Sequence, residues 1–239
     1  MVFYDPVESG FYAWCVERLL CRGDLRRYLA DGVTELGVGT GIPLLEAIDR
    51  SESSVPVRGY ERDPGAYRAA RRLADRKGPA NYSVEFGDFF EYAARAKERC
   101  VVANPPYLPA EARRPDGPGL HGGARGAAVT RRILGCPFDL AMLMISSISD
   151  PLGVLSEAGR RGYRVLDWAV RPIPFGPFCR DSAVWPILET LAADGQAYFR
   201  PEGYLLAGVT WVRDAVARLP GGDAAVLAQV MRAASAGAP

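Results

Sequence analysis

The sequence predicts an α/β fold in which helices cover both faces of a mostly parallel central sheet. Short apolar runs of strand character alternate with helical patterns along much of the chain, which is typical of parallel β-α units. A glycine-rich turn follows the first expected strand. With 239 residues the chain can bury one sizeable core, and we therefore expect a single domain over residues 1–239.

The first half of the chain predicts a helical lead-in over residues 1–31, followed by regular strand and helix alternation. In the lead-in, apolar residues recur at helical spacing, which predicts a helix over Tyr12–Leu29. The strands expected next are Val33–Leu36, Val55–Tyr60, Tyr82–Phe86 and Cys100–Ala103. The helices expected with them are Ile42–Ile48, Asp63–Arg76 and Phe89–Lys97.

The second half predicts further alternation with two interruptions. Expected strands are Leu140–Ser146, Tyr163–Ala169 and Tyr204–Val212, and expected helices are Val129–Leu134, Leu152–Arg160, Val184–Ala193 and Ala224–Ala234. One interruption is the long Gly- and Pro-rich loop Pro109–Gly126, and the other is a proline-rich bend over Pro172–Pro177. Long loops in a compact domain are often functional, so we expect a lid-like insertion over residues 172–203.

Composition limits the classes of partner. The chain has 29 basic and 28 acidic side chains, and this near-neutral balance weighs against a nucleic-acid partner, although a local patch could hide within it. Five scattered cysteines and one histidine give no metal-ligand spacing, so we expect no metal. The longest apolar run, Leu140–Ile145, is too short for a membrane span, and no secretory signal is visible. We expect a cytoplasmic protein.

The segment Glu35–Gly41 carries a G-x-G-x-G pattern directly after the first expected strand. Glycines at positions 37, 39 and 41 allow a tight turn and a close approach of the backbone to a nucleoside ligand. Glu61 follows at the end of the second expected strand, where a carboxylate can bind a ribose hydroxyl. The spacing is shorter than the G-x-G-x-x-G of dinucleotide sites, which favours a mononucleoside ligand without a pyrophosphate.

The segment Asn104-Pro105-Pro106-Tyr107 is the most specific pattern in the chain. Two prolines after a buried strand cannot continue a strand ladder, so they fix where Asn104 and the Pro105 carbonyl point. Two such acceptors can bind the N–H groups of a planar nitrogen, favour its pyramidal form and spread the positive charge that develops when it is methylated. Tyr107 is suited to stack on a flat substrate.

Both segments resemble known motifs. The first resembles motif I of class I S-adenosylmethionine-dependent methyltransferases, and the second resembles the N-P-P-Y motif of adenine and cytosine amino-methyltransferases and of HemK-type glutamine methyltransferases. The resemblance implies a Rossmann-like class I methyltransferase fold and S-adenosylmethionine as cofactor. The implied cofactor-binding residues are Glu35, Gly37, Gly39, Thr40, Gly41, Glu61, Asp88, Phe89 and Asn104. The implied catalytic residues are Asn104, Pro105, Pro106 and Tyr107.

Two further stretches favour the HemK-type branch. Leu120–Gly126 resembles that family's glycine loop, and Val2–Ser9 resembles the lead-in of members without a separate N-terminal substrate domain. The resemblance covers roughly residues 2–170 and is strongest over 33–107. His121 and Arg125 stand where the family typically has acidic residues.

The loop also supplies candidate substrate contacts. Arg113, Arg114 and Arg125 are suited to hold a carboxylate of a small substrate by bidentate bonds, while a solvated loop is the alternative. His121 is a candidate to accept a proton after transfer. With Tyr107, the candidate substrate residues are Arg113, His121 and Arg125.

The leading hypothesis is an N-methyltransferase that acts on a small molecule or a peptide side chain, with natural-product tailoring as one setting. The alternatives are a HemK-type glutamine methyltransferase acting on a release factor and a nucleic-acid amino-methyltransferase. A catalytically silent cofactor-binding protein is a fourth, against which the intact Asn104 and Tyr107 argue. The sequence leaves the methyl acceptor, the number of methyl groups transferred and the oligomeric state open.

Overall fold

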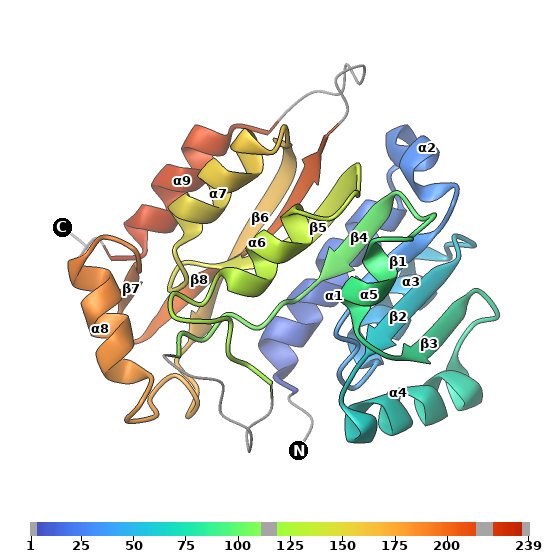
Figure 1. The fold of residues 1–239 in the computed structure, drawn as a ribbon, viewed down its shortest axis with the longest axis horizontal. Coiled ribbons are helices and arrows are strands. Elements are labelled where there is room, and N and C mark those ends of the chain that lie inside the picture. Colours follow the sequence, from blue (N-terminus) through green and yellow to red (C-terminus); the bar gives the residue numbers. More distant parts are fainter. Residues whose placement is uncertain (1–3, 111–118, 214–221, 236–239) are drawn as a thin grey trace. The chain divides into compact units, whose positions relative to one another are not determined.

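The computed structural model describes residues 4–110, 119–213 and 222–235, and Figure 1 gives its helices and strands. The strand order is β3-β2-β1-β4-β5-β8-β6, with β7 paired to β8. The described chain divides into two compact units. The first contains the residues up to Asn104 together with Cys136–Leu143, and the second contains Pro105–Gly135 and the residues from Met144 onward.

The first unit is a parallel β-α layer. Its strands are β1 (Val33–Leu36), β2 (Val57–Glu61), β3 (Tyr82–Phe86), β4 (Cys100–Ala103) and the start of β5 (Leu140–Ser146). Its helices are α1 (Pro6–Leu20), the 3-10 turn Gly23–Leu25, α2 (Arg26–Leu29), α3 (Ile42–Ser51), α4 (Pro64–Lys77) and α5 (Phe89–Ala93). All of the strand pairs within this unit are parallel, and α1 packs on α3.

The second unit continues from the end of β5 and is antiparallel. Its strands are β6 (Arg164–Pro174), β7 (Phe199–Arg200) and β8 (Gly203–Val212). Its helices are α6 (Ala128–Leu134), α7 (Pro151–Arg160), α8 (Trp185–Ala193) and α9 (Ala224–Ala233). Strand β8 pairs with β6 along ten positions and with β7 along two. Helix α7 contacts both α6 and α9.

The prediction of a mostly parallel sheet with helices on both faces is confirmed (Figure 1). Every residue of β4 and β5 is buried, which explains why both read as continuous apolar runs without alternation. Within the described ranges, no helix has the length and the apolarity that crossing a bilayer requires. The single-domain organisation over residues 1–239 stays a prediction, as does a lid role for residues 172–203.

The expected single helix over Tyr12–Leu29 is wrong in its bounds. Helix α1 begins at Pro6, because the Asp5 side chain caps it by accepting bonds from the amides of Val7 and Glu8. It ends at Leu20, and the extended backbone of Arg22 separates it from the short helical turns that follow. Of these three elements α1 is the longest, and nine of its 15 residues are buried.

The expected proline-rich bend over Pro172–Pro177 is also wrong in part. Strand β6 runs on to Pro174, so two of the prolines pair with β8 rather than forming a bend. An edge strand tolerates them because one of its sides makes no ladder hydrogen bonds, and β6 stands at the end of the strand order. Helix α5 ends at Ala93 rather than Lys97, and the two-residue β7 was too short to expect.

Close packing fixes the glycine loop against β2. Gly59 lies opposite Glu35 in the β1–β2 register, and Val38 of the loop covers it. A Cβ atom on Gly59 would lie 2.4 Å from Cγ2 of Val38 and 3.3 Å from Oε2 of Glu35. Glycine at this position therefore lets the loop settle on the sheet.

We expect Gly59→Ala to reduce the free energy of unfolding by about 1–3 kcal/mol, because the added methyl overpacks the contact with Val38. Gly10→Ala is the matched control: it lies within α1, and an added Cβ there meets no atom within 4 Å, so this change should be neutral or stabilising by about 0.5–1 kcal/mol. Urea unfolding of both variants measures the difference, and equal midpoints would contradict the packing constraint.

Candidate active site

The glycine loop leaves its backbone open on the side where a ligand would approach. Gly37, Gly39 and Gly41 all have positive φ values, of 75°, 59° and 75°. A Cβ atom on either of the first two would meet nothing within 4 Å, whereas on Gly41 it would lie 3.2 Å from Cβ of Ala70. The first two glycines therefore provide an accessible cradle, and the third permits α3 and α4 to pack closely.

Glu61 holds the shape of this loop. Its Oε2 accepts a hydrogen bond from the Gly39 amide at 2.9 Å, and its Oε1 accepts one from the Asp63 amide at 2.8 Å. The sequence suggested only a ribose ligand here, and the structure adds this role in holding the backbone. A carboxylate has about four lone-pair positions, so capacity remains for hydroxyl groups of a ligand.

Glu35 is buried beneath the loop with one oxygen satisfied. The Tyr12 hydroxyl of α1 donates to Oε1 at 2.9 Å, while Oε2 is buried and accepts no hydrogen bond from the described residues. Burial raises the pKa of the Glu35 carboxyl to about 8. The Tyr12 hydrogen bond opposes that rise in pKa and the negative charge of Glu61 adds to it. A cation beside Oε2 would favour the charged carboxylate.

Asn104 follows the last residue of β4. The register pairs Ala103 with Leu36, which places Asn104 beside the start of the glycine loop within the same unit. Its side-chain oxygen Oδ1 is buried, and it too accepts no hydrogen bond from the described residues. Two buried acceptors without partners and an open glycine backbone fit a ligand that carries cationic or N–H donor groups.

The remaining predicted cofactor residues have local structural roles. Asp88 caps α5 through a bond from the Phe90 amide to Oδ1 at 2.7 Å, and its Oδ2 has no partner among the described residues. Phe89 is buried with its ring 6.0 Å from that of Phe138, in the core of the first unit. The Thr40 hydroxyl accepts from the Ile42 amide at the start of α3. Their contacts with a cofactor stay predictions.

Pro105, Pro106 and Tyr107 belong to the second unit, where two contacts that the sequence did not suggest hold Tyr107. Its hydroxyl lies 2.6 Å from the hydroxyl of Tyr204 in β8. Its carbonyl oxygen accepts a bond from the Ser149 hydroxyl at 2.7 Å. Tyr204 is buried, so both the ring and the backbone of Tyr107 are fixed.

The loop Leu120–Gly126 packs directly on the segment Pro105–Tyr107. The amide of Gly122 donates to the Leu108 carbonyl, and a Cβ atom on Gly122 would lie 2.4 Å from the Pro106 oxygen. On Gly126, with φ 74°, a Cβ atom would lie 2.1 Å from the Tyr107 oxygen. Both glycines are therefore needed for the loop to support the Pro-Pro-Tyr backbone.

The candidate substrate residues of this loop differ in their surroundings. Nδ1 of His121 is buried and has no hydrogen-bond partner among the described residues, whereas Arg125 is exposed. Arg113 and Arg114 lie outside the described residues. A substrate role for Arg113, His121 and Arg125 stays a prediction.

Stability should depend on pH through Glu35. Because its pKa rises from 4.5 to about 8, the folded protein binds more protons than the unfolded chain between these values. The contribution of this carboxyl to stability is therefore complete below pH 4.5, declines as the pH rises and is lowest above 8. Glu35→Gln removes this decline, because glutamine does not titrate. The size of the decline is about 1.4 kcal/mol of folding free energy for each pKa unit by which the folded state differs from the unfolded chain.

Thermal unfolding of Glu35→Gln and the wild type from pH 5 to 8.5 tests this, with the variant gaining stability relative to the wild type as the pH rises. Glu85→Gln, which changes an exposed carboxylate of β3, is the control and should show no such trend. Parallel stability curves for wild type and Glu35→Gln would contradict the assignment.

Comparison with curated proteins gives two partial matches. The tRNA1(Val) (adenine(37)-N6)-methyltransferase of Actinobacillus succinogenes is 35% identical over 80 residues, which are 32% of this chain and 34% of that protein. The release factor glutamine methyltransferase of Geobacter sulfurreducens is 35% identical over 80 residues, which are 34% of this chain and 28% of that protein. The chain thus spans about a third of the length of these relatives. No protein-family profile matches it.

Solved structures match over more of the chain. A candidate RNA methyltransferase from Pyrococcus horikoshii superposes with a TM-score of 0.57 at 15% identity, covering 91% of this chain and 87% of that one. The catalytic domain of hMettl16, in complex with the MAT2A 3'UTR hairpin 1, gives 0.56 at 12% identity, with 93% and 75% covered. At such identities the likeness establishes the fold, which is the Rossmann-like fold of class I methyltransferases.

Proposed function

We propose that this chain is an S-adenosylmethionine-dependent N-methyltransferase that transfers a methyl group to a planar nitrogen. The observation that carries the proposal is the buried, unpartnered Oδ1 of Asn104, located at the end of β4 and beside the open glycine loop. A cofactor-binding protein without catalysis has no use for such an acceptor. The fold and the partial relatives support the same activity.

In this proposal the first unit holds the cofactor. S-adenosylmethionine, when bound, would supply a methyl group on a sulfonium, from which a neutral thioether departs as an excellent leaving group. Oε2 of Glu35 receives the cationic amino group, which draws the pKa of the carboxyl down from about 8 and favours its charged form. Gly37 and Gly39 allow the backbone to approach the methionine part, and Glu61 uses its remaining lone pairs for ribose hydroxyls.

Asn104 and the Pro105 carbonyl orient the acceptor nitrogen. Each oxygen accepts one N–H bond, which turns the nitrogen lone pair toward the methyl group and spreads the positive charge that develops. No general base would be required before transfer, so these residues would contribute mainly by alignment, and the methylated nitrogen would release its proton afterwards. Tyr107, fixed by Tyr204 and Ser149, stacks on the flat acceptor.

The relatives favour a macromolecular acceptor. By their names, one methylates an adenine of a tRNA and the other a glutamine of a release factor, and both acceptors are planar nitrogens. We propose RNA as the first acceptor to test. A glutamine side chain is the second candidate, because one of the two relatives is named a glutamine methyltransferase. Neither name supports the small-molecule acceptor that the sequence led us to expect.

Asn104→Ala should reduce methyl transfer by about 100-fold or more, because one acceptor of a transition-state hydrogen bond is lost, while cofactor affinity changes little. Transfer of an isotopically labelled methyl from S-adenosylmethionine into host-cell RNA and protein fractions measures the first quantity, and calorimetric titration measures the second. Turnover that survives the change would overturn the assigned chemistry.

Glu61→Gln provides the opposite pattern. The two carboxylate oxygens of Glu61 accept hydrogen bonds from the backbone amides of Gly39 and Asp63. A glutamine side chain has a single acceptor oxygen, so one of these two hydrogen bonds is lost. Cofactor affinity should fall first, and turnover at saturating cofactor should recover in part. If both variants lose only turnover, the first unit does not hold the cofactor in the way proposed.

Tyr204→Phe tests how Tyr107 is positioned. Loss of one neutral hydrogen bond should cost about 0.5–1.5 kcal/mol, which corresponds to a KM for the acceptor raised by roughly twofold to tenfold with the cofactor KM unchanged. Tyr198→Phe is the control, because it removes a hydroxyl that bonds the Gly195 carbonyl in the same unit. Equal kinetic effects of the two variants would show that Tyr204 has no positioning role.

A further inference from the structure

We propose that helix α4 carries a binding surface for the phosphate backbone of RNA, formed by Arg68, Arg72 and Arg76. The inference rests on the proposed function in one respect, since it names RNA as the macromolecule that carries the acceptor nitrogen. The surface itself is derived from the side chains of α4 within the first unit.

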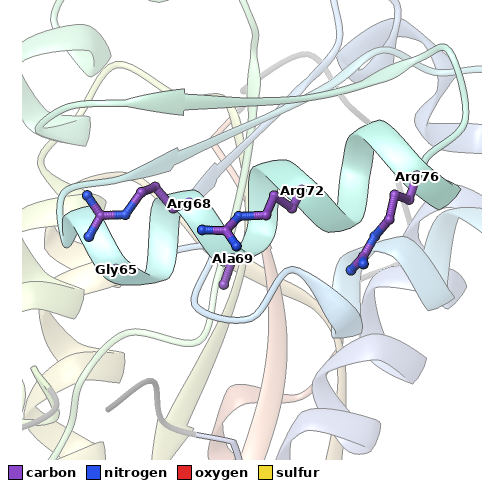
Figure 2. A pocket seen from close by; sticks show the side chains of 5 residues that line it. All are labelled: Gly65, Arg68, Ala69, Arg72 and Arg76. Atoms are coloured by element: carbon purple, nitrogen blue, oxygen red, sulfur yellow. The ribbon is translucent and has the colours of Figure 1, made fainter.

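The three arginines form a row along one face of the helix. They are spaced four residues apart, so they follow one another at successive turns over a length of about 12 Å. Figure 2 shows the three side chains following one another along α4, with Ala69 beside Arg72. Together with Gly65 and Ala69 they line a pocket of about 470 Å³. The two small residues leave the guanidinium groups accessible.

These guanidinium groups have no partner among the described residues. The neighbouring Arg71, by contrast, bonds Asp75 at 3.0 Å on the same helix. The three members of the row are exposed, and no described carboxylate neutralises them. Their charge is therefore available to a ligand, although each must give up hydration to use it.

The charge of the chain is unevenly distributed. Residues 62–77 contain six basic and two acidic side chains, a net charge of +4, while the whole chain has a formal net charge of +1. The remainder must be net negative. A near-neutral total thus conceals a local basic stretch, so the total charge alone does not weigh against a nucleic-acid partner.

The composition of the row favours a polyanion over a protein partner. Protein interfaces usually centre on aromatic or large apolar anchors in a desolvated core, and the lining of this pocket has only Gly65 and Ala69 besides the arginines. Evenly spaced guanidinium groups suit a ligand with evenly spaced negative charges, and their planar forks bind phosphate oxygens in pairs. An RNA strand has both properties.

The location connects this surface to the proposed chemistry. Helix α4 begins at Pro64, capped by Asp63, whose amide is bonded by the Glu61 carboxylate that also holds the glycine loop. The arginine row and the cofactor loop therefore belong to one compact unit and are linked through a single side chain. RNA bound along α4 is held by the same unit that presents Asn104.

The test compares two triple variants of the full chain. Arg68→Gln, Arg72→Gln and Arg76→Gln together remove the row. The control combines Arg26→Gln, Arg95→Gln and Arg232→Gln, three exposed arginines elsewhere in the chain, and so has the same net charge. Binding of a fluorescently labelled tRNA transcript is measured by anisotropy between about 50 and 200 mM salt. Circular dichroism confirms that both variants are folded.

In the row variant we expect the slope of log affinity against log salt to become less negative by about 2–3, which is the change expected for the loss of three phosphate contacts. The control variant should keep the wild-type slope. Equal slopes for both variants would overturn the proposal. So would binding of poly-glutamate or duplex DNA as tight as binding of the tRNA transcript, since either result assigns the surface to a different partner.

The same assay separates this inference from the proposed function. Asn104→Ala should keep the wild-type salt dependence of transcript binding, which the phosphate contacts set, and methylate the transcript about 100-fold or more slowly. The row variant should methylate RNA with a raised KM and an unchanged kcat. If only the proposed function is wrong, the row and control variants still differ in transcript binding, but no label enters RNA. If only the proposed surface is wrong, RNA is labelled and the row and control variants methylate it equally.

Discussion

The two hydrogen bonds accepted by Glu61 are the interaction on which the candidate site depends. One fixes Gly39 in the loop after β1, and the other fixes Asp63 at the start of α4. The glycine loop is thus joined at one carboxylate to the turn between β2 and α4, 22 positions further along the chain. Gly59 makes the arrangement possible, because the loop can rest on β2 only where no side chain intervenes. The position of the loop, the start of α4 and the environment of Glu35 all follow from this contact.

A second consequence concerns the charge of the site. Two carboxylates, Glu35 and Glu61, lie close enough beneath the loop for one to raise the pKa of the other, and Glu35 is almost fully buried. Without a cation nearby, this arrangement favours a neutral Glu35. A ligand with a positive amino group changes that balance, so affinity for such a ligand includes the ionisation of Glu35. The site therefore selects for charge as well as for shape.

Local sequence patterns were sufficient for most strands and for the glycine loop, because these depend on residues that are neighbours in the chain. They were insufficient where partners are distant. Tyr12 and Glu35 are 23 positions apart, and Tyr107 and Tyr204 are 97 apart, so no periodicity or motif links them. The arginine row of α4 was visible residue by residue, yet the total charge concealed it. Helix ends were missed where a cap such as Asp5 decided them.

Pro172 and Pro174 of β6 also affect the outer edge of the sheet. Phe175 donates its amide to the Glu202 carbonyl, so the odd-numbered positions at this end of the strand face its partner, and Pro172 and Pro174 face the other way. Neither proline has an N–H group, so the outer side of this end of β6 offers no donor at either position to a strand from another molecule. At these positions the sequence thereby disfavours intermolecular strand addition, the first step of many aggregation reactions.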